Sequence, residues 1–376
     1  MALLWFGLLL IWLLPHWGAL WCAVIALGAI AAALGSSWIL FSQYSTLIAP
    51  FYFAFVIVLL YLTQSLQVYL ASEKEKKEVR GAFGRYLSPV LVEQLANDPD
   101  KLKLGGETRQ ISALFCDIRG FTNLSEQLAP EELTALLNRF LTPLTDVILN
   151  EQGTIDKYMG DCIMAFWNAP VDVPDHEHRA CSAALKMLDA LTDLNQALRR
   201  EAEGSGTNIQ ELRIGIGINS GKALAGNLGS EQRFDYSILG DSVNLASRLE
   251  GQSKTYGVEI LMSEATRAPV QDLAFLELDL VQVVGKSEPV RIFTLVGDAS
   301  LARSEVFLEA ESVQKHMLEC YRARRWQEAL ELIGQLEQLD LQRFQGYLSM
   351  MRQRIEAFKN APPGEDWDGV ERRLVK

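Results

Sequence analysis

The segments ISALFCDIRGFT (residues 111–122) and TIDKYMGDCIMAFW (residues 154–167) carry the strongest structural pattern in this chain. The first is an apolar, β-rich run that contains Asp117 near its end. The second reads as a β-hairpin whose turn is Met159-Gly160-Asp161. Residues 130–151, between them, have the apolar spacing of an amphipathic helix. Both acidic residues are therefore expected at strand ends, where side chains far apart in the sequence can meet.

The rest of this region continues to alternate helices and strands. Helices are expected over residues 175–200 and 242–254, and strands over residues 211–219, 233–239, 258–263, 273–284 and 290–296. This order predicts an α+β fold with a ferredoxin-like βαββαβ centre. Gly215 and Gly217 in RIGIGINSG are expected to be close-packing strand positions, since no dinucleotide motif is completed around them. His176 and His178 are expected to be solvated at the start of a surface helix.

Charge is distributed unevenly along the 376 residues, because no Asp, Glu, Lys or Arg precedes Glu73. Such an apolar run predicts a membrane region. Breaks near Pro15, over residues 35–38 and at Pro50 divide it into three expected spans, residues 2–14, 19–34 and 50–70. The first is shorter than the roughly 20 residues of a full span, and a signal peptide is the competing interpretation for it. The basic residues of EKEKKEVR place the following chain in the cytoplasm and the N-terminus outside.

Beyond the membrane region, residues 72–96 suggest a helix interrupted near Pro89, with a solvated linker as the alternative. At the other end of the chain, two helices are expected over residues 301–323 and 326–358, followed by a polar tail.

The five cysteines show no C-x-x-C spacing and are expected to be free thiols. A net charge of -12 argues against a nucleic-acid partner, because phosphate binding needs a basic face.

Asp117 and Asp161 are the leading candidates for chemistry. Taken singly, each would pass for a turn or cap residue, but two carboxylates in one site could bind divalent metal and so clamp a triphosphate. Residues 118–122 end a strand and open a helix, so their backbone N–H groups could contact phosphate oxygens. The alternative is an ordinary strand-to-helix turn with Thr122 as the N-cap.

FCDIRGFT, TIDKYMGD and YSILGDSVNLASRLE (residues 236–250) resemble the three signature segments of class III adenylyl cyclases. The resemblance runs from about residue 105 to 296. The segment RGAFGRYLSPVLVEQL and the tail resemble bacterial members that carry a CHASE2 sensor before three membrane spans, although this chain lacks that sensor. The implied organisation is a transmembrane region over 1–71, a juxtamembrane segment over 72–104, a class III cyclase catalytic domain over 105–297 and a helical appendage with a polar tail over 298–376.

The resemblance also implies roles for individual residues. Asp117, Ile118 and Asp161 would hold the metals, and Asn244 and Arg248 would orient the ribose and stabilise charge in the transition state. Lys157 would donate to N1 of adenine, whereas a guanylyl cyclase usually has glutamate there. Ser237 stands where many members have aspartate, and its hydroxyl can either accept from an amino group or donate to a carbonyl. The remaining implied substrate-binding residues are Phe121, Thr122 and Lys286. Lys286 lies two residues after the position of the family's phosphate-binding lysine.

The function implied by the resemblance is conversion of ATP to cyclic AMP and pyrophosphate, with two Mg²⁺ or Mn²⁺ per active site. In the family, the metal-binding aspartates face the Lys157, Asn244 and Arg248 group across a dimer interface. Because one chain carries both of these residue sets, a homodimer with two shared sites is expected. The implied location is the bacterial inner membrane, with several spans in contact with lipid and the catalytic domain in the cytoplasm. A guanylate cyclase and a catalytically silent cyclase-like module are the rival interpretations.

Overall fold

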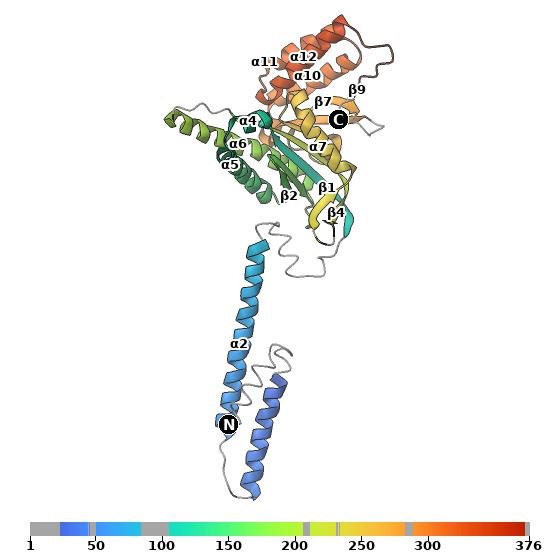
Figure 1. The fold of residues 1–376 in the computed structure, drawn as a ribbon. Coiled ribbons are helices and arrows are strands. Elements are labelled where there is room, and N and C mark those ends of the chain that lie inside the picture. The colour runs from blue at the N-terminus through green and yellow to red at the C-terminus, as the bar shows by residue number, and fades with distance from the viewer. Residues whose placement is uncertain are drawn as a thin grey trace. The chain divides into compact units, whose positions relative to one another are not determined.

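The computed structural model describes residues 23–43, 45, 50–83, 105–205, 211–230, 232, 234–282 and 289–372. The chain divides into two compact units, Met1–Lys101 and Leu102–Lys376. The first unit contains the helix Ala23–Gln43 and α2 (Pro50–Phe83), both drawn in blue in Figure 1. By length and composition, Ala23–Gln43 and the Pro50–Gln67 part of α2 are candidate membrane spans, and many of their large apolar side chains are exposed.

The described N-terminal helices differ from the sequence prediction at one break. The sequence predicts an interruption over residues 35–38, but the helix Ala23–Gln43 runs through them. The Ser36 hydroxyl donates to the Ala33 carbonyl at 3.0 Å, so the polar side chain is satisfied inside the helix. The helix α2 begins at Pro50, where the sequence predicts the start of the last span. The predicted first span and the break near Pro89 lie outside the described residues.

The second unit is built on a nine-stranded sheet with the order β2-β3-β1-β4-β6-β8-β7-β9, and β5 pairs with β4 off this path. The strands are β1 (Gly105–Ile118), β2 (Thr154–Met159), β3 (Cys162–Trp167), β4 (Ile214–Gly229), β5 (Phe234–Leu239), β6 (Ile260–Ser263), β7 (Ala274–Gln282), β8 (Val290–Gly297) and β9 (Glu371–Arg372). The chain order β1, helix, β2, β3, helix, β4 with the spatial order β2-β3-β1-β4, antiparallel throughout, is the ferredoxin-like βαββαβ arrangement. The predicted fold class is therefore confirmed.

Helices cover both faces of this sheet. α5 (Pro130–Asn150) and α6 (His176–Ser205) pack on one face, where Leu114 and Cys116 of β1 join the core. α7 (Asp241–Tyr256) packs on the other, where alternate β1 residues Ala113 and Phe115 meet Val243. Two short helices, α4 (Phe121–Gln127) and α8 (Glu264–Arg267), follow β1 and β6. Asp117 continues the row of Ala113 and Phe115, so it lies on the α7 face.

α7 can approach the sheet closely because β4 carries glycines beneath it. A Cβ on Gly217 would lie 2.2 Å from the Glu250 amide nitrogen and 2.3 Å from the Ala246 carbonyl oxygen. On Gly215 it would lie 2.8 Å from Glu250 Oε1. The predicted close-packing role of both glycines is confirmed.

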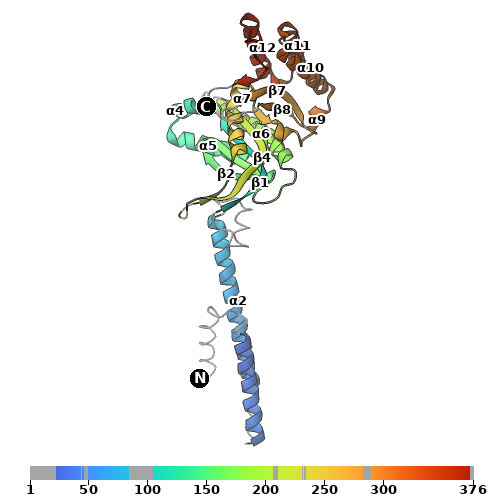
Figure 2. The ribbon, with the colours of Figure 1, turned by 90° about the vertical axis from the view of Figure 1, so that its right-hand side faces the viewer.

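The C-terminal helices are α9 (Ala299–Ala302), α10 (Glu305–Arg322), α11 (Trp326–Gln338), the 3-10 turn η2 (Gln342–Phe344) and α12 (Gln345–Asn360). The prediction of a single helix over residues 326–358 is therefore wrong. Asp340 adopts a left-handed φ of 48° and separates α11 from α12. Figures 1 and 2 show α10, α11 and α12 gathered beside β7. Their apolar faces share one core with α7 and β7.

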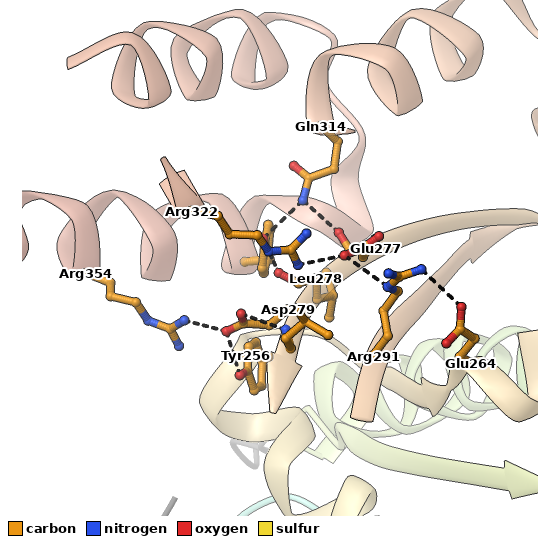
Figure 3. A network of polar contacts seen from close by, with 11 residues as sticks. Tyr256, Glu264, Glu277, Leu278, Asp279, Arg291, Gln314, Arg322 and Arg354 are labelled. Atoms are coloured by element: carbon orange, nitrogen blue, oxygen red, sulfur yellow. Dashed lines mark hydrogen bonds and ion pairs between the residues drawn. The ribbon is translucent and has the colours of Figure 1, made fainter. Parts of the chain in front are cut away.

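A buried polar network joins these helices to the sheet (Figure 3). Asp279 on β7 accepts from Arg354 on α12 at 2.6 Å and from the Tyr256 hydroxyl at the end of α7 at 2.9 Å. Its side chain has no exposed surface, and that of Arg354 is 11% exposed. Burial lowers the pKa of Arg354, but the Asp279 charge outweighs it and leaves that pKa raised.

Three smaller expectations, on two histidines and on the cysteines, have different outcomes. His176 is buried, which contradicts the predicted solvation, because its Nδ1 lies 2.8 Å from the Ser112 hydroxyl inside the fold. His178 is partly exposed, which agrees with the predicted contact with solvent, and its Nε2 lies 3.3 Å from Asp272. The four cysteines in the described part of the chain are free thiols, as predicted, and Cys22 lies outside it.

Candidate active site

The two predicted metal-binding aspartates meet at one end of the central strands. Asp117 is the penultimate residue of β1, and Asp161 occupies the two-residue turn between β2 and β3. The amide of Ile118 donates to Asp161 Oδ2 and to Asp117 Oδ1, each at 3.1 Å. Burial, a hydrogen bond with Asp117 and the charge of Asp117 raise the pKa of Asp161 to about 7. The fold therefore holds two carboxyl groups in contact at a cost that a bound cation would relieve.

A third carboxyl group, which the sequence analysis does not single out, lies near this pair. Glu250 is on the face of α7 that covers β4, above Gly215. Burial and then the charge of Asp117 raise the pKa of Glu250 to about 7, while Arg119 opposes this shift. Glu250 belongs to the signature segment of residues 236–250, but its side-chain direction depends on how closely α7 lies on β4.

Lys157 and Ser237, the predicted purine-binding residues, meet at a second cluster. Tyr236 of β5 lies over Phe166 of β3, with ring centroids 6.3 Å apart, so β5 reaches back towards the β2–β3 hairpin. Ser237 there donates to Asp156 Oδ2 at 2.5 Å. Lys157 Nζ lies 3.1 Å from Asp156 Oδ1. Two residues that are 80 positions apart (237 − 157) thus share one carboxylate.

Sequence reasoning misses Asp156 because of strand alternation. In a regular strand, neighbours such as Asp156 and Lys157 point to opposite faces. Here the register of β2 on β3 shifts between Ile155 and Lys157, so Asp156 is the extra residue of a bulge. A bulge leaves no reliable mark in a short strand sequence, although an acid directly before Lys157 is a weak signal.

Asn244 and Arg248 lie one helical turn apart on α7. Asn244 is exposed and Arg248 is partly buried. The Arg248 Nη1 atom is buried and has no hydrogen-bond partner in the described structure, which suits a guanidinium group that receives an anion. Neither side chain is among the groups that hydrogen-bond Asp117 or Asp161 in the described part of the chain. Within one chain, Asp117 and Asp161 thus contact each other but do not hydrogen-bond Asn244 or Arg248.

The predicted phosphate-contacting residues lie at the start of α4. The helix begins at Phe121, and its N-cap is Gly120 with a left-handed φ of 76°, so the alternative that Thr122 is the N-cap is wrong. Glycine suits this position because it adopts positive φ without strain. Thr122 is exposed and Phe121 is partly buried. Lys286 lies outside the described residues.

The acidic cluster fits divalent metal. Carboxylate and carbonyl oxygens are the ligands that Mg²⁺ and Mn²⁺ prefer. Asp117 and Asp161 supply such oxygens, and the raised pKa of Asp161 reflects carboxyl groups packed together. An anionic triphosphate would be repelled from this cluster without an intervening cation.

A different group of possible metal ligands, His316, Cys320 and Glu328, lies on α10 and α11. The carboxylate of Glu328 is already paired, with His316 Nε2 at 3.2 Å and with Arg325 Nη1 at 2.7 Å. A guanidinium at that distance disfavours a cation at the same carboxylate. We interpret this group as an ion-pair network between the two helices.

The sheet, the acidic pair and the signature segments agree with known proteins. Residues 106–297 match the family model of the adenylate and guanylate cyclase catalytic domain. This match covers half of the chain, which therefore belongs to that family: it contains a class III nucleotide cyclase domain. The family includes enzymes for both purine nucleotides, so membership alone leaves the substrate open.

Two curated relatives are adenylate cyclases. Adenylate cyclase 1 of Rhizobium meliloti is 36% identical over 190 residues, which are 50% of this chain and 28% of the relative. Adenylate cyclase of Anabaena cylindrica is 32% identical over 238 residues, 62% of this chain and 45% of the relative. The chain thus spans less than half the length of either. A bacterial light-regulated adenylyl cyclase of solved structure aligns with a TM-score of 0.50 at 22% identity, over 62% of this chain and 65% of that one, and supports the fold.

Proposed function

We propose that this protein is a membrane-anchored adenylate cyclase that converts ATP to 3′,5′-cyclic AMP and pyrophosphate at sites shared between two copies of the chain. The observation that carries the proposal is the contact between Asp117 and Asp161 at the ends of the central strands of a cyclase domain. Lys157 favours ATP, because an ammonium group donates to N1 of adenine and is repelled by the N1–H of guanine. The relatives named adenylate cyclase favour the same substrate.

In the proposed reaction, the ribose 3′-oxygen bonds to the α-phosphorus, and the bond from that phosphorus to the pyrophosphate oxygen breaks. The hydroxyl proton leaves to solvent. Two Mg²⁺ or Mn²⁺ ions, held by Asp117, Asp161 and the Ile118 carbonyl, would supply hydroxyl activation and charge neutralisation. Arg248 would donate to the phosphoryl oxygens as charge develops, and Asn244 would orient the ribose. Phe121, Thr122 and Lys286 would contact the phosphates.

Homodimer formation supplies the missing half of each site in this proposal. The acidic pair and the pair on α7 lack a direct contact in the described structure of one chain, and the family resemblance sets them opposite each other across an interface. Anchoring in the bacterial inner membrane is proposed from the two candidate spans and the basic residues that follow them.

The test uses the full chain in membranes of a host that lacks cyclases. With Mg²⁺ or Mn²⁺, ATP should yield cyclic AMP, and GTP should yield little cyclic GMP. Asp117→Ala and Asp161→Ala should each lower turnover by about a thousandfold or more, because both metal positions depend on them. Asp146→Ala, an exposed α5 carboxylate, is the matched control and should remain active. Preferential formation of cyclic GMP would establish the guanylate cyclase alternative, and no product from either nucleotide would favour a silent module.

A further inference from the structure

Asp156 is a buried acid at the second cluster. Its side chain has no exposed surface, whereas that of Lys157 is 43% exposed. Its Oδ2 accepts from the Ser237 hydroxyl at 2.5 Å. Its Oδ1 is 3.1 Å from the ammonium of Lys157 in an ion pair that lacks hydrogen-bond geometry. A buried carboxylate is expensive unless it is paired, so these two partners account for its presence there.

The contact with Asp156 fixes the direction of the Ser237 hydroxyl. A serine hydroxyl has one proton to donate and two lone pairs that accept, and an ionised carboxylate only accepts. The Ser237 proton is therefore directed at Asp156. The Ser237 oxygen can then only accept from any further group. Next to it, the Lys157 ammonium can only donate.

We propose that Asp156 is a specificity-determining positioning residue, which selects adenine over guanine by holding the Ser237 hydroxyl as an acceptor beside the Lys157 donor. This inference rests on the proposed function, in which Lys157 and Ser237 contact the base. Adenine has an amino group at position 6 and an acceptor at N1, so it matches an acceptor beside a donor. Guanine has a carbonyl at position 6 and an N1–H, so both of its groups are mismatched. The ambiguity of a serine at this position is thereby removed.

The bulge in β2 makes this arrangement possible. Because the register shifts between Ile155 and Lys157, the carboxylate of Asp156 and the ammonium of Lys157 lie on the same side of the strand. β5 then brings Ser237 against them from a distant part of the sequence. If Asp156 had a purely structural role, its substitution would lower stability, and it would change turnover of ATP and of GTP by the same factor.

The experiment compares the full-length wild type, Asp156→Asn and the exposed β5 control Asp235→Asn in membranes. For each we would measure kcat/KM with ATP, GTP and inosine triphosphate, which has the 6-carbonyl but lacks the 2-amino group of guanine. We would also measure equilibrium binding of non-cyclisable ATP and GTP analogues. In Asp156→Asn, the amide oxygen should face the Lys157 ammonium and the amide nitrogen should donate to Ser237, which frees the Ser237 proton to face the base. The ATP-to-GTP and ATP-to-inosine triphosphate ratios should therefore fall about tenfold, as expected for one mismatched buried hydrogen bond. Asp235→Asn should leave both ratios unchanged.

A double-mutant cycle tests whether Asp156 acts through Ser237. In a Ser237→Ala background, Asp156→Asn should have no further effect on the ratios, because no hydroxyl remains to be oriented. Asp156→Ala, the second variant, should behave like Asp156→Asn and keeps the test available if the amide destabilises the fold. Ratios within twofold of wild type in both variants would overturn the inference. Lack of cyclic product from the wild type would instead refute the proposed function, and the binding ratios would still decide the role of Asp156.

Discussion

At the scale of single residues, Asp117 and Asp161 pose an electrostatic problem that the fold does not solve by itself. Two carboxyl groups in contact in a partly buried site cannot both ionise without a cost. That cost appears as the pKa of Asp161, raised to about 7 by burial and by Asp117. The same arrangement that destabilises the metal-free protein prepares oxygen ligands for a cation, because their positions are fixed before the cation arrives.

This raised pKa predicts how the stability of the metal-free protein depends on pH. Folded Asp161 binds its proton more tightly than the unfolded chain does, so stability should fall as pH rises from 3.8 to about 7. Unfolding by urea, measured in a chelator across this range, should show that loss. Mg²⁺ should restore stability above pH 7 and have little effect near pH 4. Asp161→Asn should reduce this loss and leave the part that is due to the raised pKa of Glu250, whereas the exposed Asp146→Asn should not change the profile. A wild-type profile that rises through this window would contradict the prediction.

Much of the candidate site can be predicted at this scale. The aspartates and the Lys157–Ser237 pair come together because their signature segments end or flank strands that the alternation of apolar residues already indicates. Asp156 and His176 are missed for physical reasons. A bulge changes the face of one residue, and a polar side chain such as Ser112 can satisfy a buried histidine from far along the chain.

At the scale of elements, the position of α7 depends on two glycines that leave room for its backbone. Gly217→Ala would force the helix away from β4, since the new Cβ would lie 2.2 Å from the Glu250 amide nitrogen. We expect a loss of about 1–3 kcal/mol of stability from this overpacking. Turnover should fall by about a hundredfold, because the displaced helix carries Asn244 and Arg248.

Chemical denaturation and cyclic AMP assays of the same preparations would check this prediction. Gly251→Ala is the matched control, because a Cβ there meets nothing within 4 Å and the position lies inside α7. It should stabilise the protein by up to about 1 kcal/mol through helix propensity. Equal effects of the two substitutions would mean that helix packing on β4 is not what matters.

Helices and strands can be predicted where apolar residues recur at a regular spacing. They are harder to predict where the conformation of a single residue determines where a helix ends. α5 and the strands β2, β3, β5 and β8 follow the sequence pattern closely. β4 instead continues to Gly229, beyond the predicted end at residue 219, and β9 lies in what the sequence predicts to be a polar tail. The division between α11 and α12 depends on the left-handed Asp340, at a point where neither proline nor glycine marks a stop. Conversely, Gly35 suggests a break that the helix Ala23–Gln43 does not make.

At the scale of the whole molecule, the C-terminal helices are part of the catalytic domain's core. Arg354 and Asp279 link α12 to β7 and, through Tyr256, to the end of α7 (Figure 3). Arg354→Ala would leave a buried carboxylate without its cation and should cost about 3–5 kcal/mol. Arg352→Ala removes the half-exposed pair with Glu337 and should cost about 1 kcal/mol or less.

Denaturation of both variants would measure this difference. Because Tyr256 ends the helix that carries Arg248, the Arg354→Ala variant should also lose turnover before it unfolds globally. Replacing Arg354 and Asp279 together with Met and Leu should recover most of the lost stability, since no unpaired charge remains. Similar costs for Arg354→Ala and Arg352→Ala would show that the buried pair does not hold the appendage.

The proposed assembly of two chains predicts complementation between two inactive variants. Asp117→Ala removes a metal ligand, and Arg248→Ala removes the phosphoryl donor, so neither homodimer has an intact site. In a mixed dimer, one site combines both substitutions and the other combines two unaltered sets. Random pairing makes about half of the dimers mixed, so co-expression should restore about a quarter of wild-type cyclic AMP formation. Mixing Asp117→Ala with Asp161→Ala is the control and should restore nothing, because both changes fall in the same residue set. No recovery in the first mixture would show that the aspartates and α7 act within one chain, and equal recovery in the two mixtures would contradict the division into these two residue sets.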